Sequence, residues 1–118
     1  ERIDQGCKNP WVYDPNKPNE AEYGLLGGGN LDTPERQQRA LLASPIHYVD
    51  AGDPPMLLLH GRQDCVVAVV QSQAMHAALQ KAGVPSQLRL IVADHAEAKF
   101  YTDPQLQKLL LDFLRQYL

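Results

Sequence analysis

Four consecutive apolar residues, Met56–Leu59, run directly into His60-Gly61. A short unbroken apolar run is typical of a β-strand buried on both faces, as in a parallel sheet covered by helices. Gly61 permits a sharp exit from this strand, which leaves Asp64 in the loop at its carboxyl end. Ligands and chemistry gather at that edge in open α/β sheets. We therefore expect the functional residues of the chain near this strand exit.

After Asp64, the apolar positions change to a helical period, which predicts a helix from about Val69 to Ala82 with residues 66–68 as a loop. Gly83 ends this helix, and the proline that follows prevents its continuation. The apolar residues Leu88, Leu90, Ile91 and Val92 predict a second short strand. A strand–helix–strand connection of this length implies a right-handed parallel crossover. Asp64 and His95 are then expected at the same edge of two neighbouring strands.

Two further helices are predicted by their first residues. Thr33-Pro34 provides an N-cap and a proline in the first turn, and Asp103-Pro104 repeats this pattern near the carboxyl end. Ser44-Pro45 ends the first of these helices. We expect its buried side to consist of Ala40, Leu41 and Leu42. We expect the apolar side of the last helix to consist of Leu106, Leu109, Leu110, Phe113, Leu114 and Tyr117.

Residues 1–30 differ in composition, because proline, glycine and asparagine are frequent there. Each proline restricts its own φ and biases the residue before it away from a helix. We expect an irregular covering segment over 1–30 and a folded half-domain over 31–118. The Gly27–Gly29 run lacks the Gly-Lys-Ser/Thr ending of a phosphate-binding loop, which argues against a nucleotide site.

The 118 residues allow one domain, and their net charge of −3 comes without a cluster of basic residues. We therefore expect no nucleic-acid partner. No apolar run approaches the roughly 20 residues of a membrane span, so we expect no membrane partner. No secretory signal is visible, which favours the cytoplasm, although a start at Glu1 leaves a processed or truncated form open. Cys7 and Cys65 do not resemble a disulfide framework, and we expect them unpaired.

Asp64 and His95 have the residue types of an acid–base pair. A carboxylate that accepts a hydrogen bond from a histidine ring fixes its tautomer, and the pair then deprotonates a nucleophile. Spacing leaves a simpler alternative open, in which Asp64 caps the next helix and His95 is a loop histidine. A zinc site from His60, Asp64 and His95 lacks local ligand spacing. We expect no metal and no cofactor, and we interpret His60 as a packed residue at the strand end.

Residues 25–118 resemble the C-terminal part of an α/β-hydrolase of the esterase/lipase and dienelactone-hydrolase-like branch. The resemblance rests on Ser44–Val49, Pro54–Asp64, Val67–Ser72, Leu79–Pro85, and His95 with the terminal helix. It implies an α/β fold, namely the C-terminal half of an α/β-hydrolase, with a short parallel sheet of two core strands and flanking helices. It also implies that Asp64 is the acid and His95 the base of a catalytic triad.

The chain departs from this family at the nucleophile. The family places its serine in a Gly-x-Ser-x-Gly turn between a strand and a helix, and Ser44, Ser72 and Ser86 all lie outside such a motif. The loop that forms the oxyanion hole is absent as well. Asp94 precedes His95 and is a possible competitor for its ring N–H. Cys65 is a poor substitute nucleophile, because it follows the acid directly.

These observations leave three hypotheses. The first is a hydrolase fragment, inactive by itself, that acts on a small ester when the missing N-terminal part completes it. The second is a stand-alone binding or assembly module that keeps the half-fold without catalysis. The third is a small-molecule or metal-binding pocket at Asp64 and His95. Because two strands leave an open sheet edge, we also expect a homodimer unless upstream strands of the same protein fill that place.

Overall fold

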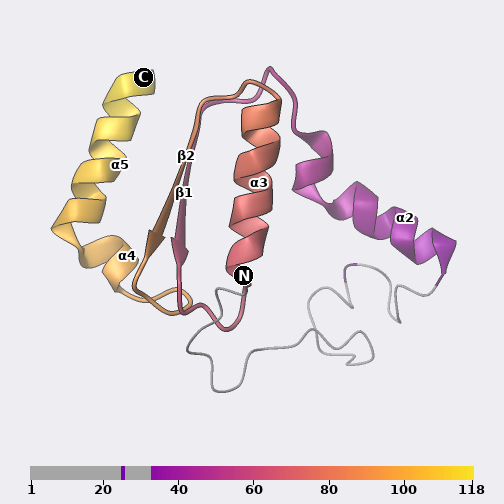
Figure 1. Ribbon diagram of the computed structural model, residues 1–118, viewed down its shortest axis with the longest axis horizontal. Coiled ribbons are helices and arrows are strands. Elements are labelled where there is room, and N and C mark those ends of the chain that lie inside the picture. Colours follow the sequence, from indigo (N-terminus) through magenta and orange to yellow (C-terminus); the bar gives the residue numbers. More distant parts are fainter. Residues whose placement is uncertain (1–24, 26–32) are drawn as a thin grey trace. The chain divides into compact units, whose positions relative to one another are not determined.

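The structure is a computed structural model that describes residue 25 and residues 33–118 (Figure 1). The covering segment expected at 1–30 lies almost wholly outside these residues. The described residues fall into two compact units that divide between Val49 and Asp50. The expected domain limits of 1–30 and 31–118 remain a prediction.

The first unit contains α2, Pro34–Ala43, and a 3₁₀-helix, Pro45–Tyr48. Thr33 caps α2, because its hydroxyl oxygen accepts the backbone N–H of Arg36 at 3.3 Å. The predicted start and end of this helix are therefore confirmed.

The predicted buried side of α2 is wrong. Leu41 and Leu42 are 50% and 55% exposed, and Ala40 is only half-buried. Within the described part of this unit, α2 packs on the short 3₁₀-helix, which is too small to cover an apolar stripe. The sequence shows the stripe, but it does not show that the described residues of this unit offer no surface large enough to bury it.

The second unit is a parallel two-stranded sheet with helices on both sides. Its elements are β1 (Met56–Gly61), α3 (Val69–Lys81), β2 (Ser86–Ile91), α4 (Lys99–Thr102) and α5 (Pro104–Tyr117). β1 pairs with β2 in parallel, from Met56 beside Ser86 to Gly61 beside Ile91. Figure 1 shows α3 on one side of the strands and α5 on the other. The predicted α/β class, with two core strands and flanking helices, is confirmed.

The ends of these elements follow from single residues. α3 stops at Lys81 because Gly83 adopts a φ of +81°, a left-handed conformation that strains any side-chain-bearing residue. Asp103 caps α5, since its carboxylate accepts the backbone N–H of Gln105 at 2.8 Å. α4 was not predicted, because a helix of one turn is too short to show a period.

The core of this unit lies between the sheet and its helices. Its buried apolar residues are Val69, Leu79, Val84, Ala93, Leu106 and Phe113. Two expectations need correction. β1 is largely half-buried, with burial complete only at His60 and Gly61. Of the predicted apolar side of α5, Leu110 and Leu114 are exposed. Two strands offer too little sheet surface to cover both.

Among the described residues, no helix combines the length and the apolar character that a membrane span requires.

Candidate active site

The carboxyl ends of β1 and β2 approach each other so closely that only glycine fits at position 61. A Cβ atom there would lie 2.3 Å from the carbonyl oxygen of Ala93. The exits of the two strands are joined by backbone hydrogen bonds, from Arg62 N–H to Ile91 at 2.8 Å and from Gln63 N–H to Ala93 at 3.1 Å. The loops that carry Asp64 and His95 are therefore adjacent.

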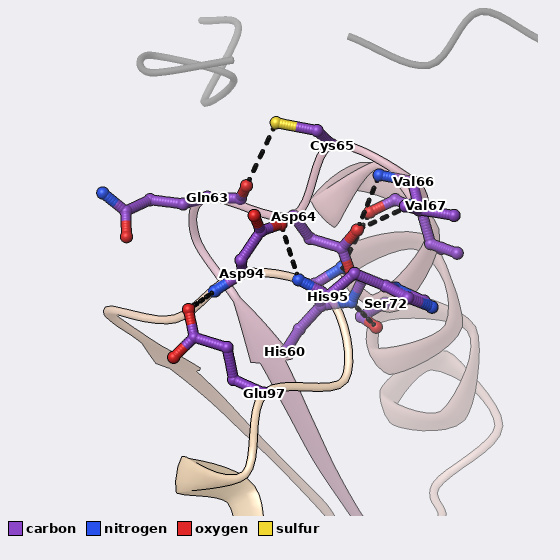
Figure 2. A network of polar contacts seen from close by, with 10 residues as sticks. All are labelled: His60, Gln63, Asp64, Cys65, Val66, Val67, Ser72, Asp94, His95 and Glu97. Carbon is purple, nitrogen blue, oxygen red and sulfur yellow. Dashed lines mark hydrogen bonds and ion pairs between the residues drawn. The ribbon is translucent and has the colours of Figure 1, made fainter.

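Asp64 divides its two carboxylate oxygens between a turn and a histidine. Its Oδ1 accepts the backbone N–H groups of Val66 and Val67 at 2.9 and 2.7 Å, which closes the turn that leads into α3. Its Oδ2 lies 2.9 Å from the Nδ1 of His95 (Figure 2). The side chain is only 7% exposed. The simple capping interpretation and the acid–base interpretation are thus compatible, because each uses a different oxygen.

His95 presents its other ring nitrogen away from the carboxylate. Its side chain is 41% exposed, and Nε2 has no hydrogen-bond partner among the residues that the structure describes. Asp94 does not compete for the ring, because its Oδ1 accepts the backbone N–H of His95 at 2.7 Å. Glu97 in turn accepts the backbone N–H of Asp94 at 2.6 Å and braces the loop.

The environment of Asp64 favours its ionised form. Burial by itself raises the pKa of this carboxyl, but the hydrogen bonds from Val67, His95 and Val66 and the charge of His95 outweigh it and lower the pKa below its usual value. An ionised carboxylate that faces Nδ1 requires a proton on that nitrogen. The Nε2 of a neutral His95 is then free to accept a proton from a nucleophile.

The two serines of this unit have hydroxyl groups that are engaged by other histidines. The hydroxyl of Ser72 lies 2.7 Å from His60 Nδ1, and that of Ser86 lies 2.7 Å from His76 Nδ1. Ser44 ends α2 in the other unit. The hydroxyl groups of Ser72 and Ser86 therefore bind histidines other than His95.

Cys65 is excluded as a substitute nucleophile, because it is disulfide-bonded. The expectation of unpaired cysteines is therefore wrong, and the partner of Cys65 lies outside the described residues. The distance between two cysteines depends on the tertiary path of the chain, which spacing along the sequence does not reveal.

His60, near the end of β1, packs against Asp64 and is 6% exposed. The interpretation as a packed residue is confirmed, but sequence reasoning missed its contact with the acid. Its Nε2 lies 2.9 Å from the carbonyl oxygen of Val67 and 3.3 Å from Asp64 Oδ2. The four-residue spacing from Asp64 was the available signal. No cluster suited to a metal ion is found among the described residues.

This arrangement places a carboxylate and a histidine at the carboxyl edge of a parallel α/β sheet, which is the organisation of an α/β-hydrolase-type protein. Residues 5–79 match the family model BD-FAE, and the chain belongs to this family. The matched residues include Asp64 but end before His95. The place of His95 in the site is therefore supported by its contact with Asp64 and not by the family match.

A second comparison points to the same class of protein. The chain is 51% identical to the esterase LipQ of Mycobacterium tuberculosis (strain ATCC 25618 / H37Rv) over 41 residues. These residues are 35% of the chain and only 10% of that esterase. The matched stretch is thus a small part of the curated relative.

We expect Gly61→Ala to separate the two loops. The added methyl group would meet backbone atoms that cannot rotate away, at a cost of about 2 kcal/mol in unfolding free energy. Urea denaturation measures this cost, and Gly52→Ala is a control, since there the close neighbour is a side-chain oxygen of Asp50. Equal stability of Gly61→Ala and the unmodified chain would contradict the close approach.

The lowered pKa of Asp64 predicts a pH dependence of stability. Folding favours the ionised carboxylate, so its contribution is complete above the unfolded pKa of about 3.9 and is lost as the pH falls through the lower folded pKa. We expect the difference in unfolding free energy between the unmodified chain and Asp64→Asn to shrink below about pH 4. Denaturation at several pH values tests this, with the half-exposed Asp112→Asn as a control. A difference independent of pH would refute it.

Proposed function

We propose that this chain supplies the acid and the base of a carboxylic ester hydrolase whose nucleophile and oxyanion hole lie elsewhere. The observation that carries the proposal is the 2.9 Å contact between His95 Nδ1 and Asp64 Oδ2, with the Nε2 of His95 unpartnered among the described residues. Membership of an α/β-hydrolase-type family and the similarity to an esterase support the reaction class.

The proposed chemistry follows from the two ring nitrogens of His95. Nε2 accepts the proton of an attacking hydroxyl as that oxygen bonds to the carbonyl carbon of a small ester. The imidazolium that forms is stabilised by Asp64 through Nδ1, and it then gives its proton to the leaving alcohol. Because Asp64 is buried and ionised, its charge acts at short range on the ring.

The nucleophile is proposed to come from an upstream part of the same protein or from another chain. The sequence has no Gly-x-Ser-x-Gly motif, and the Oγ atoms of Ser72 and Ser86 bind other histidines. The catalytic machinery in this chain is therefore two-thirds of a triad. We propose that the isolated chain has no appreciable esterase activity.

Hydrolysis of p-nitrophenyl acetate tests this assignment. We expect the isolated chain to show no rate above that of its His95→Ala variant. When an upstream part with a nucleophile turn is supplied, in the same chain or as a separate one, we expect hydrolysis that is sensitive to a serine-directed phosphonate. His95→Ala should then lower kcat by about 10³-fold or more, because triad members act as a unit.

The control for this assay is His76→Ala, which removes a histidine that binds Ser86 at the start of β2, the opposite end of the sheet. A His95-dependent rate in the isolated chain would contradict the missing nucleophile. Equal rates of the completed enzyme with and without His95 would contradict the role of this residue.

We also propose that the open edge of the sheet is covered in the functional protein, by a second copy of the chain or by upstream strands. Among the described residues, each of the two paired strands has one edge without a partner strand, and such edges associate readily. Apolar side chains are exposed on this unit as well, among them Val70, Val92, Leu110 and Leu111. A dimer would bury on the order of 1,500 Å².

Size-exclusion chromatography with light scattering tests the covered edge. The chain has a mass of 13.2 kDa, and we expect the purified protein at micromolar concentration to elute with about twice that mass. If an upstream part is present, we expect a monomer of the longer protein instead. A well-folded monomer of 13.2 kDa would refute this proposal.

A further inference from the structure

His60 is a buried polar side chain that the proposed chemistry does not use. It is the second-last residue of β1, where it lies beside Leu90 of β2, and it is 6% exposed. Its ring reaches three different segments: Ser72 in α3, Val67 in the loop before α3, and Asp64. A buried ring that is hydrogen-bonded through both nitrogens is held in one orientation. It therefore restricts the movement of the polar groups that it binds.

The partners of the ring determine its tautomer. Nε2 faces two oxygens that only accept, the carbonyl of Val67 at 2.9 Å and the Asp64 carboxylate at 3.3 Å. Nε2 must therefore carry a proton. Nδ1 faces the hydroxyl of Ser72 at 2.7 Å, and a hydroxyl can donate to it. The Nε2–H donates a hydrogen bond to the carbonyl oxygen of Val67. The same N–H group also lies close to the negatively charged Asp64 carboxylate, which attracts it.

We propose that His60 is a positioning residue that holds Asp64 in the orientation in which it binds His95 (Figure 2). One N–H group bridges the two ends of the turn from Asp64 to Val67. The two ends of this turn are also joined directly, by the hydrogen bond from Val67 N–H to Asp64 Oδ1. With Oδ1 engaged by the backbone and the turn anchored at Val67, Oδ2 is left facing His95.

A purely structural role for His60 makes a different prediction. A histidine that only fills the core would lower stability when replaced, as would His76, which likewise links α3 to a strand through a serine. Of these two histidines, only His60 contacts the turn that carries the acid. Its replacement should therefore change the state of the His95 ring as well as stability.

Two replacements separate the nitrogens of the ring. The amide N–H of glutamine in His60→Gln reaches the place of Nε2, and that of asparagine in His60→Asn reaches the place of Nδ1. Both variants are polar, so both are compatible with the hydrogen bonds around the site. His76→Asn is the matched control at the opposite end of the sheet.

The measurement is the tautomer of His95 in the purified ¹⁵N-labelled chain, from two-bond ¹H–¹⁵N correlations of the imidazole rings at about pH 8, above the ordinary pKa of imidazole. In the unmodified chain we expect a proton on Nδ1 of His95 and on Nε2 of His60. We expect His60→Gln and His76→Asn to retain the Nδ1–H signature of His95. We expect His60→Asn to lose it.

Retention of the signature in both His60 variants, or its loss in both, would overturn the proposal, as would its loss in His76→Asn. If His60→Asn does not fold, the unmodified chain still decides, because a His60 ring with its proton on Nδ1 would overturn the proposed bridge. The inference rests on the proposed function only in treating the positioned pair as catalytic. The tautomer is measured without ester hydrolysis, so an inactive completed enzyme would contradict the function and leave the positioning intact.

Discussion

The site depends on the way in which the Asp64 carboxylate is shared. One oxygen accepts two backbone N–H groups of the turn before α3, and the other faces the rings of His95 and His60. A carboxylate in this position loses hydration, and the hydrogen bonds that it gains replace that hydration. The group that closes the local turn is therefore the same group that fixes the histidine of the neighbouring loop.

This sharing requires the two loops to start close together, and Gly61 is the residue that permits it. The parallel register places Gly61 beside Ile91, so that both strands end at the same level. The carbonyl of Ala93 then occupies the space where a side chain at position 61 would lie. A backbone contact between two strand exits thus sets the separation of two side chains that are 31 positions apart in the sequence.

The sequence predicted those features that single residues determine. Thr33-Pro34 and Asp103-Pro104 begin helices, and Gly83 follows the end of one, because caps and left-handed turns are local. The contact between Asp64 and His95 was also predictable, since a helical crossover makes the two strands parallel and so places their carboxyl ends at one edge. Their catalytic assignment remains a prediction that the structure makes chemically reasonable.

The features that the sequence did not predict depend on surfaces that come together only in three dimensions. Leu41 and Leu42 have the period of a buried stripe, but burial needs an opposing surface, and the described residues of their unit offer none of sufficient size. The reach of His60 depends on the path of the loop that brings the Val67 carbonyl back over the strand end. The pairing of Cys65 likewise depends on the tertiary path of the chain.

Under the proposed function, the polar groups around the site divide into those that are bonded within the unit and those that are open. Among the described residues, every hydrogen bond and ion pair of the Asp64 carboxylate comes from residues 60–95, whereas the Nε2 of His95 and the outer edges of the two strands have no partner there. The satisfied groups hold the acid–base pair in shape without help. The open groups are those that a nucleophile and a further strand would engage. If the nucleophile is supplied as proposed, it meets an acid–base pair whose described contacts are already in place.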